Sequence, residues 1–161
     1  MSLNLTMTGD WNKAGLLLQN LSVKLFPAFK AQIDEDGQFV LEKLQGHIDN
    51  QDLGWTPLAK RTVELKGGDT TILVETGTLR NSLSVRRIKS SASGSTIFIG
   101  ASPWKGHSPS GQKLSTLMIW LEYGTDKMPP RPLIRPTIEE VEDEIKKHWR
   151  ELFEDLLKGD K

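Results

Sequence analysis

The sequence predicts an α+β fold, with helices at both ends of the chain and a small antiparallel sheet between them. Apolar residues recur about once per helical turn in the first third of the chain and again near its end, which is the spacing of one face of an α-helix. Around residues 84–101 the spacing changes to alternation on either side of a short connection rich in serine and glycine. This change predicts a β-hairpin, and we expect the long C-terminal helix to pack on its sheet.

The length of 161 residues corresponds to a single domain. We divide it into a helical N-terminal part at 1–50, a β-containing body at 51–136 with an exposed loop at 102–114, and a C-terminal helix at 137–158. No apolar run approaches the roughly 20 residues that cross a bilayer. The first residues also lack the basic and apolar regions of a signal peptide.

The first predicted helix runs from Trp11 to about Ile48. Pro27 lies inside it and Gly37 lies between its two halves, so we expect one bent helix or two consecutive helices. Its apolar stripe is expected to face the core, with contact to a partner as the alternative. The stripe consists of Leu17, Leu21, Leu25, Phe29, Val40, Leu44 and Ile48.

The body of the chain begins with residues that favour turns and helix starts. Thr56–Pro57 suits the cap and first position of a short helix at 58–66. Residues 72–74 are a short β-prone run, and Thr76–Thr78 is a cap signal for a helical turn at 79–83.

Two strands are predicted next, at 84–89 and 95–101, and the alternation in the second directs one of its faces inwards. Their apolar residues are Val85, Ile88, Ile97, Ile99 and Ala101.

A short apolar helix at 115–123 follows, closed by Gly124, a residue type that ends helices in the left-handed conformation. Residues 128–136 are rich in proline and are therefore predicted to be extended. Thr137 is expected to cap the last helix, which runs to about Lys158 with a continuous apolar stripe.

The composition limits the classes of function. The 21 basic and 21 acidic residues give a formal net charge of zero, which argues against free nucleic acid as the main partner. A charge near zero also does little to keep identical copies apart. The absence of cysteine excludes disulfides, thiol catalysis and zinc sites built on cysteine.

No pattern of catalytic or cofactor-binding residues stands out. The chain has no phosphate-binding loop, and Ser108 and Ser110 lack the context of a nucleophile elbow. His47 with Asp49 and Asp52 could be imagined as metal ligands, but we favour a solvated helix end. His107 and His148 are assigned to the surface or an interface. We therefore expect a non-enzymatic protein without cofactor or metal.

Two features leave a binding role open. The proline-rich segment at 129–136 could imitate a polyproline ligand, although its place between two helices favours a structural connector. A basic cluster could contact nucleic acid, but a charged edge strand protected against aggregation explains it equally well. This cluster consists of Arg80, Arg86, Arg87 and Lys89.

Three segments together carry a resemblance to a known family. They are GWTPLAKRTVELK at 54–66, ILVETGTLRNSL at 72–83 and IWLEYGTDKMPPRPLIRP at 119–136. In this order the chain resembles the virion-morphogenesis and tail-component family of tailed bacteriophages, over about residues 54–145. The departures are Ile119–Leu121, where the family has an aromatic residue followed by alanine, and Glu122–Tyr123, where it has a histidine.

The resemblance implies a structural virion protein of the tail-completion, minor-tail or head–tail joining type. Copies would form a closed ring in the neck region through head-to-tail contacts, within a virion assembled in the host cytoplasm. The implied partners are head–tail connector, tail terminator or tail tube proteins, with nucleic acid only as DNA passing through the ring. The alternative is a small DNA- or protein-binding module without catalytic activity.

Twelve residues of these segments are candidate structural or interface residues. Among them, Trp55, Leu79 and Trp120 are expected in the core, and Arg131 in either a buried ion pair or a contact with a neighbour. The apolar stripes of the two end helices are candidates for packing between subunits. The twelve are Trp55, Pro57, Leu58, Thr76, Gly77, Leu79, Trp120, Gly124, Thr125, Pro129, Arg131 and Pro132.

Overall fold

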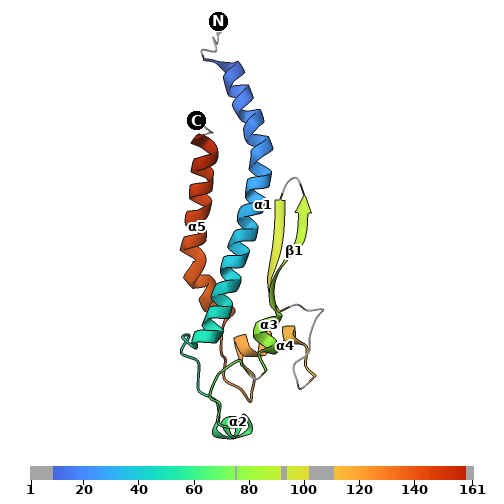
Figure 1. Ribbon diagram of the computed structural model, residues 1–161, viewed down its shortest axis with the longest axis vertical. Helices are drawn as coiled ribbons and strands as arrows, with labels where there is room; N and C mark the ends of the chain where they lie inside the picture. Colours follow the sequence, from blue (N-terminus) through green and yellow to red (C-terminus); the bar gives the residue numbers. More distant parts are fainter. Residues whose placement is uncertain (1–8, 75, 92–93, 102–110, 159–161) are drawn as a thin grey trace, which may run out of the picture.

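The computed structural model describes residues 9–74, 76–91, 94–101 and 111–158. A helix of 40 residues, α1 (Trp11–Asn50), runs through the centre of the molecule. The C-terminal helix α5 (Ile134–Lys158) lies antiparallel along one side of α1, and the hairpin lies along the other side (Figure 1). The predicted α+β class is therefore confirmed. The packing differs from the expectation in one respect, because α5 packs on α1 and not on the sheet.

Helix α1 is continuous through both positions where the sequence suggests a bend or a break. Pro27 is exposed, so the hydrogen bond that a proline removes is lost on the solvent side. Gly37 is buried, and a Cβ atom there would lie 2.6 Å from Ile97 Cδ1 and 3.0 Å from Val85 Cγ1. Glycine at position 37 therefore allows the hairpin to approach the helix closely.

The hairpin consists of β1 (Leu83–Ser91) and β2 (Gly94–Ala101), paired antiparallel with Val85 opposite Ile99. Both predicted strands are confirmed, each slightly longer than expected. The register shifts between Arg87 and Lys89. Ile88, at this irregularity, is 63% exposed instead of sharing the inward face.

Three short helices complete the described chain: α2 (Lys60–Leu65), α3 (Thr78–Ser82) and α4 (Leu114–Tyr123). All three lie near the predicted positions. The β-prone residues 72–74 do not form a strand. Instead, the side-chain amide of Gln51 replaces a partner strand, accepting from the Ile72 backbone N–H at 2.8 Å and donating to the Ile72 carbonyl at 2.9 Å.

The start of α5 differs from its prediction. The helix begins at Ile134, so Thr137 lies inside it and donates its hydroxyl proton to the Leu133 carbonyl at 2.6 Å. The cap is the carboxylate of Glu122 on α4, which accepts from the backbone N–H groups of Leu133, Ile134 and Arg135, each at 2.9 Å. Proline at position 136 fits this arrangement, since it has no N–H group that needs a partner.

The core lies where the C-terminal half of α1 meets α3, α4, the base of the hairpin and the start of α5. Its buried members are Val40, Leu44, Ile48, Trp55, Leu79, Leu83, Ala101, Leu114, Met118, Leu121, Leu133 and Val141. Where both apolar stripes are described they meet within the chain, as Phe29 does with Trp149 and Phe153. Of the predicted exposed loop at 102–114, residues 102–110 lie outside the described residues. Over the part of the chain that the structure describes, no helix is both long and apolar enough to span a membrane.

Candidate functional site

The three segments that carry the family resemblance meet at one end of the molecule. This end holds α2, α3 and α4 and lies opposite the start of α1 and the end of α5 (Figure 1). We call it the motif junction, formed by residues 54–66, 72–74, 76–83 and 119–136.

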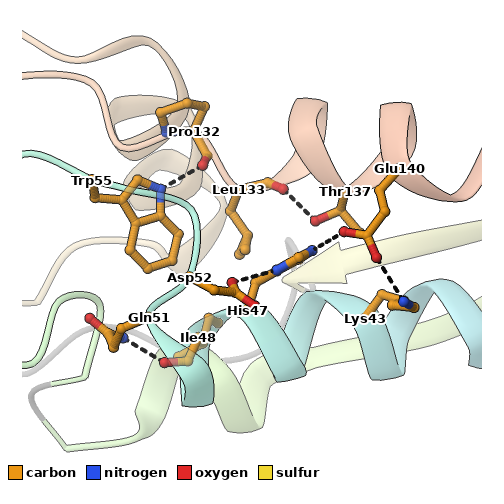
Figure 2. A network of polar contacts seen from close by, with 10 residues as sticks. All are labelled: Lys43, His47, Ile48, Gln51, Asp52, Trp55, Pro132, Leu133, Thr137 and Glu140. Atoms are coloured by element: carbon orange, nitrogen blue, oxygen red, sulfur yellow. Dashed lines mark hydrogen bonds and ion pairs between the residues drawn. The ribbon is translucent and has the colours of Figure 1, made fainter.

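Trp55 and Arg131 join the first and third segments by exchanging hydrogen bonds. Trp55 is buried, and its Nε1–H donates to the Pro132 carbonyl at 2.7 Å (Figure 2). In return, Arg131 Nε donates to the Thr56 carbonyl at 3.1 Å and Nη2 donates to the Pro57 carbonyl at 3.3 Å. Each segment therefore supplies both a donor side chain and backbone acceptors for the other.

Arg131 is only 6% exposed, which is unusual for an arginine. Its backbone N–H also donates to the Leu121 carbonyl at 2.6 Å. The guanidinium thus faces carbonyl oxygens of its own chain, where the sequence suggested either a carboxylate partner or a contact with a neighbour. The adjacent prolines hold the backbone extended, which fixes the direction of this side chain.

Gly124 and Thr125 shape the turn between α4 and the proline-rich segment. Gly124 has a φ of 76°, and a Cβ atom there would lie 2.9 Å from both the Met128 carbonyl oxygen and the Pro130 nitrogen. Thr125 and Met128 then exchange backbone hydrogen bonds of 2.9 and 3.1 Å. Glycine is therefore required by both conformation and space. Gly124 ends α4 as predicted, but its ψ of −178° lies outside the left-handed helical region.

The motif junction holds an apolar cavity of about 320 Å³ that is open to the surface. All three segments contribute to its wall, together with α4. Of the twelve predicted site residues, the cavity is lined by Leu58, Thr76, Leu79 and Arg131. Leu65 at its edge is 80% exposed, and Ile119 and Tyr123 on α4 are 59% and 69% exposed. This end of the protein therefore presents both an apolar hollow and exposed apolar side chains.

The other predicted site residues have mixed environments. Gly77 starts α3 with a φ of 69° and accepts from the Asn81 N–H at 2.9 Å. Trp55 and Leu79 are buried as expected, but Trp120 is only half-buried, so its assignment to the core is wrong. Pro57 and Pro129 are exposed, and Pro132 is half-buried.

A polar network lies next to the motif junction, and the sequence did not reveal it. His47 is 7% exposed, with Nδ1 at 2.7 Å from Asp52 Oδ1 (Figure 2). Its Nε2 lies 3.0 Å from Glu140 Oε2, close enough for an ion pair but without the alignment of a hydrogen bond. Lys43 Nζ contacts the other Glu140 oxygen at 2.7 Å, and this hydrogen bond lowers the pKa of Glu140.

The predicted solvated helix end is therefore wrong for His47. The first turns of α5 cover it, and Glu140 comes from a part of the chain that local sequence patterns do not connect to residue 47. His148 makes a similar contact further along α1, with Nδ1 at 2.8 Å from the buried Asp36 Oδ1. His107 lies outside the described residues. No group of three or more His, Asp or Glu side chains suited to a metal ion occurs in the described part of the chain.

Two members of the basic cluster are paired with acidic residues of α1. Arg80 makes a two-pronged contact with Asp49, both bonds 2.6 Å long, which lowers the pKa of Asp49 and raises that of Arg80. Arg87 pairs with Asp34. These contacts neutralise the charges of Arg80 and Arg87, which weakens the case for a surface that binds nucleic acid.

Comparison of the chain with protein-family models, with curated proteins and with solved structures found no match.

Proposed function

We propose that this protein is a non-enzymatic structural subunit of a tailed-phage virion that completes the tail or joins it to the head. The observation that carries the proposal is the motif junction. The three segments that resemble the virion-morphogenesis family are one structural unit, in which Trp55 and Arg131 hold two of them together. A resemblance confined to three local motifs gains weight when those motifs share one cavity.

The junction also offers a physical basis for assembly. The apolar cavity and the exposed Leu65 at its edge form a surface that a neighbouring virion protein would cover. This surface lies at one end of an elongated molecule. A contact between unlike surfaces of identical subunits closes into a ring when the rotation permits, which is the neck assembly proposed here.

A complementation experiment tests the proposal. Particles are prepared from a phage whose copy of this gene is disrupted, and purified protein is added. We expect wild-type protein to bind at the open tail or neck and to restore joined particles, as seen by negative-stain microscopy. Leu65→Glu should abolish binding, since it places a charge on the exposed edge of the cavity.

Ile88→Glu is the matched control, because Ile88 is also an exposed apolar residue but lies on the hairpin, outside the cavity wall. It should bind like the wild type. A folded protein that neither forms rings nor binds the incomplete particles would contradict the proposal.

A protein-binding module outside any virion is the second candidate, favoured by the same cavity. The two are distinguished by the genes around this one. Flanking portal, head-completion or tail-tube genes would support the virion role, whereas their absence and capture of a non-viral partner would support the second candidate.

A further inference from the structure

The wall of the cavity in the motif junction is apolar and positively charged. Leucine, isoleucine and valine side chains form most of it, and two cationic side chains, Lys66 and Arg131, lie among them. The other polar members are four threonines, and none of the described residues in the wall is acidic. Such a wall favours a ligand that combines an apolar body with a negatively charged group.

The two cations of the wall differ in how their charge is balanced. Lys66 Nζ lies 3.0 Å from Asp69 Oδ2 and also donates to the Thr71 and Val74 carbonyls, at 2.6 and 2.8 Å. Arg131 is only 6% exposed, and among the described residues it contacts backbone carbonyls but no carboxylate. A carbonyl oxygen carries only a partial negative charge, so the buried charge of Arg131 is left without a full counter-charge.

One nitrogen of the Arg131 guanidinium remains available to a ligand. Nε and Nη2 donate to the Thr56 and Pro57 carbonyls, which fixes the orientation of the planar group. Nη1 has no acceptor among the described residues, yet it is not one of their fully buried atoms without a partner, which are Asp36 Oδ2 and His47 Nε2. Nη1 is therefore open to solvent, and the solvent space that Arg131 borders is the cavity.

The apolar surface continues from the cavity to the outside of the molecule. Leu65 belongs to the wall and is 80% exposed. A small molecule bound in this open cavity would leave Leu65 in water, whereas a protein segment can fill the cavity and also cover its edge. The occupant that matches both features is therefore a segment of a protein.

We propose that the cavity binds an acidic, apolar segment of a neighbouring protein. One carboxylate of this segment pairs with Arg131, and the adjacent apolar side chains contact the wall as far as Leu65. The carboxylate forms a charge-assisted hydrogen bond with Nη1 and supplies the counter-charge that Arg131 lacks. Because the guanidinium is already buried and held in place, little further desolvation or ordering of this side chain opposes binding. The inference rests on the proposed function, since it names the chemistry by which a neighbouring virion protein would recognise this surface.

Titration of the full chain with two blocked tetrapeptides, followed by NMR spectroscopy, tests this inference. One peptide has the sequence leucine–glutamate–leucine–leucine, and the other carries glutamine in place of glutamate. We expect the glutamate peptide to shift the methyl signals of wall residues such as Leu58 and Leu117, together with the guanidinium signals of Arg131. It should bind about tenfold more tightly than the glutamine peptide, as expected for a hydrogen bond between charged groups.

Thr62 provides a matched pair of variants, because it lines the cavity but is exposed on α2, where a substitution leaves the core intact. Thr62→Glu places a negative charge in the wall, one helical turn from Lys66. It should weaken binding of the glutamate peptide several-fold. Thr62→Gln has nearly the same size without the charge, and should bind this peptide as the wild type does. Thermal unfolding shows whether both variants keep the fold.

Equal affinity for the two peptides, or binding that leaves the signals of the wall and of Arg131 unchanged, would overturn the inference. Binding of decanoate, a free fatty acid, without binding of either peptide would overturn a protein segment as the occupant. Neither result would decide the proposed function, because the particle experiment measures assembly with the virion itself. Conversely, a protein that binds the glutamate peptide in the cavity but not the incomplete particles would contradict the proposed function alone.

Discussion

At the scale of single residues, Glu122 shows how one side chain can determine where a helix begins. Its carboxylate satisfies three backbone N–H groups at the start of α5, which otherwise have no partner within the helix. We predict that Glu122→Ala lowers the free energy of unfolding by roughly 1–3 kcal/mol. Glu122→Gln should lose less, because its amide oxygen can still accept. Urea unfolding measures the stability of both variants, with Glu139→Ala at an exposed position as the control. Equal stability of all three variants would contradict the role of Glu122 as the cap of α5.

Trp55 and Arg131 form the second case, since each donates to the backbone of the other's segment. Trp55→Phe keeps an aromatic ring but leaves the Pro132 carbonyl without its donor, and Arg131→Lys replaces a planar fork with a single amine. We expect each to cost roughly 1–3 kcal/mol. The losses should not add in the double variant, because both bonds join the same two segments. Strictly additive losses of stability in a double-mutant cycle would show that Trp55 and Arg131 act independently of each other.

Asp69 allows a prediction of pH dependence. Hydrogen bonds from Thr71, followed by that from Lys66, lower its pKa from 3.8 to about 2. A depressed carboxyl pKa means that the stabilisation is present above the ordinary pKa and is lost as the pH falls through the folded value. The melting temperatures of wild type and Asp69→Asn should therefore differ above pH 4 and converge as the pH approaches 2. A constant difference across this window would show that the Asp69 charge is not responsible.

At the scale of elements, two glycines of α1 should respond oppositely to the same substitution. A Cβ atom at Gly46 meets nothing within 4 Å, whereas at Gly37 it meets Ile97 and Val85 of the hairpin. Gly46→Ala should stabilise the protein by up to about 1 kcal/mol through helix propensity. In Gly37→Ala, the close contact of the new Cβ atom with Ile97 and Val85 should cancel the stabilisation from helix propensity. Gly37→Leu should destabilise the protein by roughly 1–3 kcal/mol, because the larger side chain forces the hairpin away from α1. Chemical unfolding of the three variants checks the order, and similar gains at both glycines would contradict the close packing.

Elements governed by local chemistry could be predicted from the sequence. The two strands of the hairpin, the end of α4 at Gly124 and the helices α1 and α5 each depend on residues close in the chain. The start of α5 could not, because Thr137 offers a valid local cap while the actual cap comes from Glu122. Gly37 likewise has the composition of a break, and only the distant hairpin explains it.

The same limit applies to the candidate site. The motif segments could be singled out from the sequence, but the bond from Trp55 to Pro132 spans 77 residues. No local pattern indicates that contact, or that the Arg131 guanidinium would face carbonyl oxygens. His47 was misassigned for the same reason, since its burial depends on the first turns of α5.

At the scale of the whole molecule, α1 is shared by two regions of different character. Its C-terminal half belongs to the core, together with Trp55, Leu83 and Val141, which come from three other parts of the chain. Its N-terminal end, at 11–23, projects beyond α5. A continuous helix thus connects the packed body to a segment that lies outside the contact between α1 and α5.

This division predicts how the molecule opens, as measured by hydrogen exchange of its backbone amides. Because α1, α5 and the motif junction share one core, amides at 40–48 and 134–145 should exchange with similar, high protection, as members of one cooperative unit. Amides at 11–22 lie beyond the end of α5 and should exchange much faster than those of the core. Early exchange throughout α5, with 40–48 still protected, would instead indicate that α5 opens separately from the core. Protection of 11–22 as high as that of 40–48 would contradict this division of α1 into two regions.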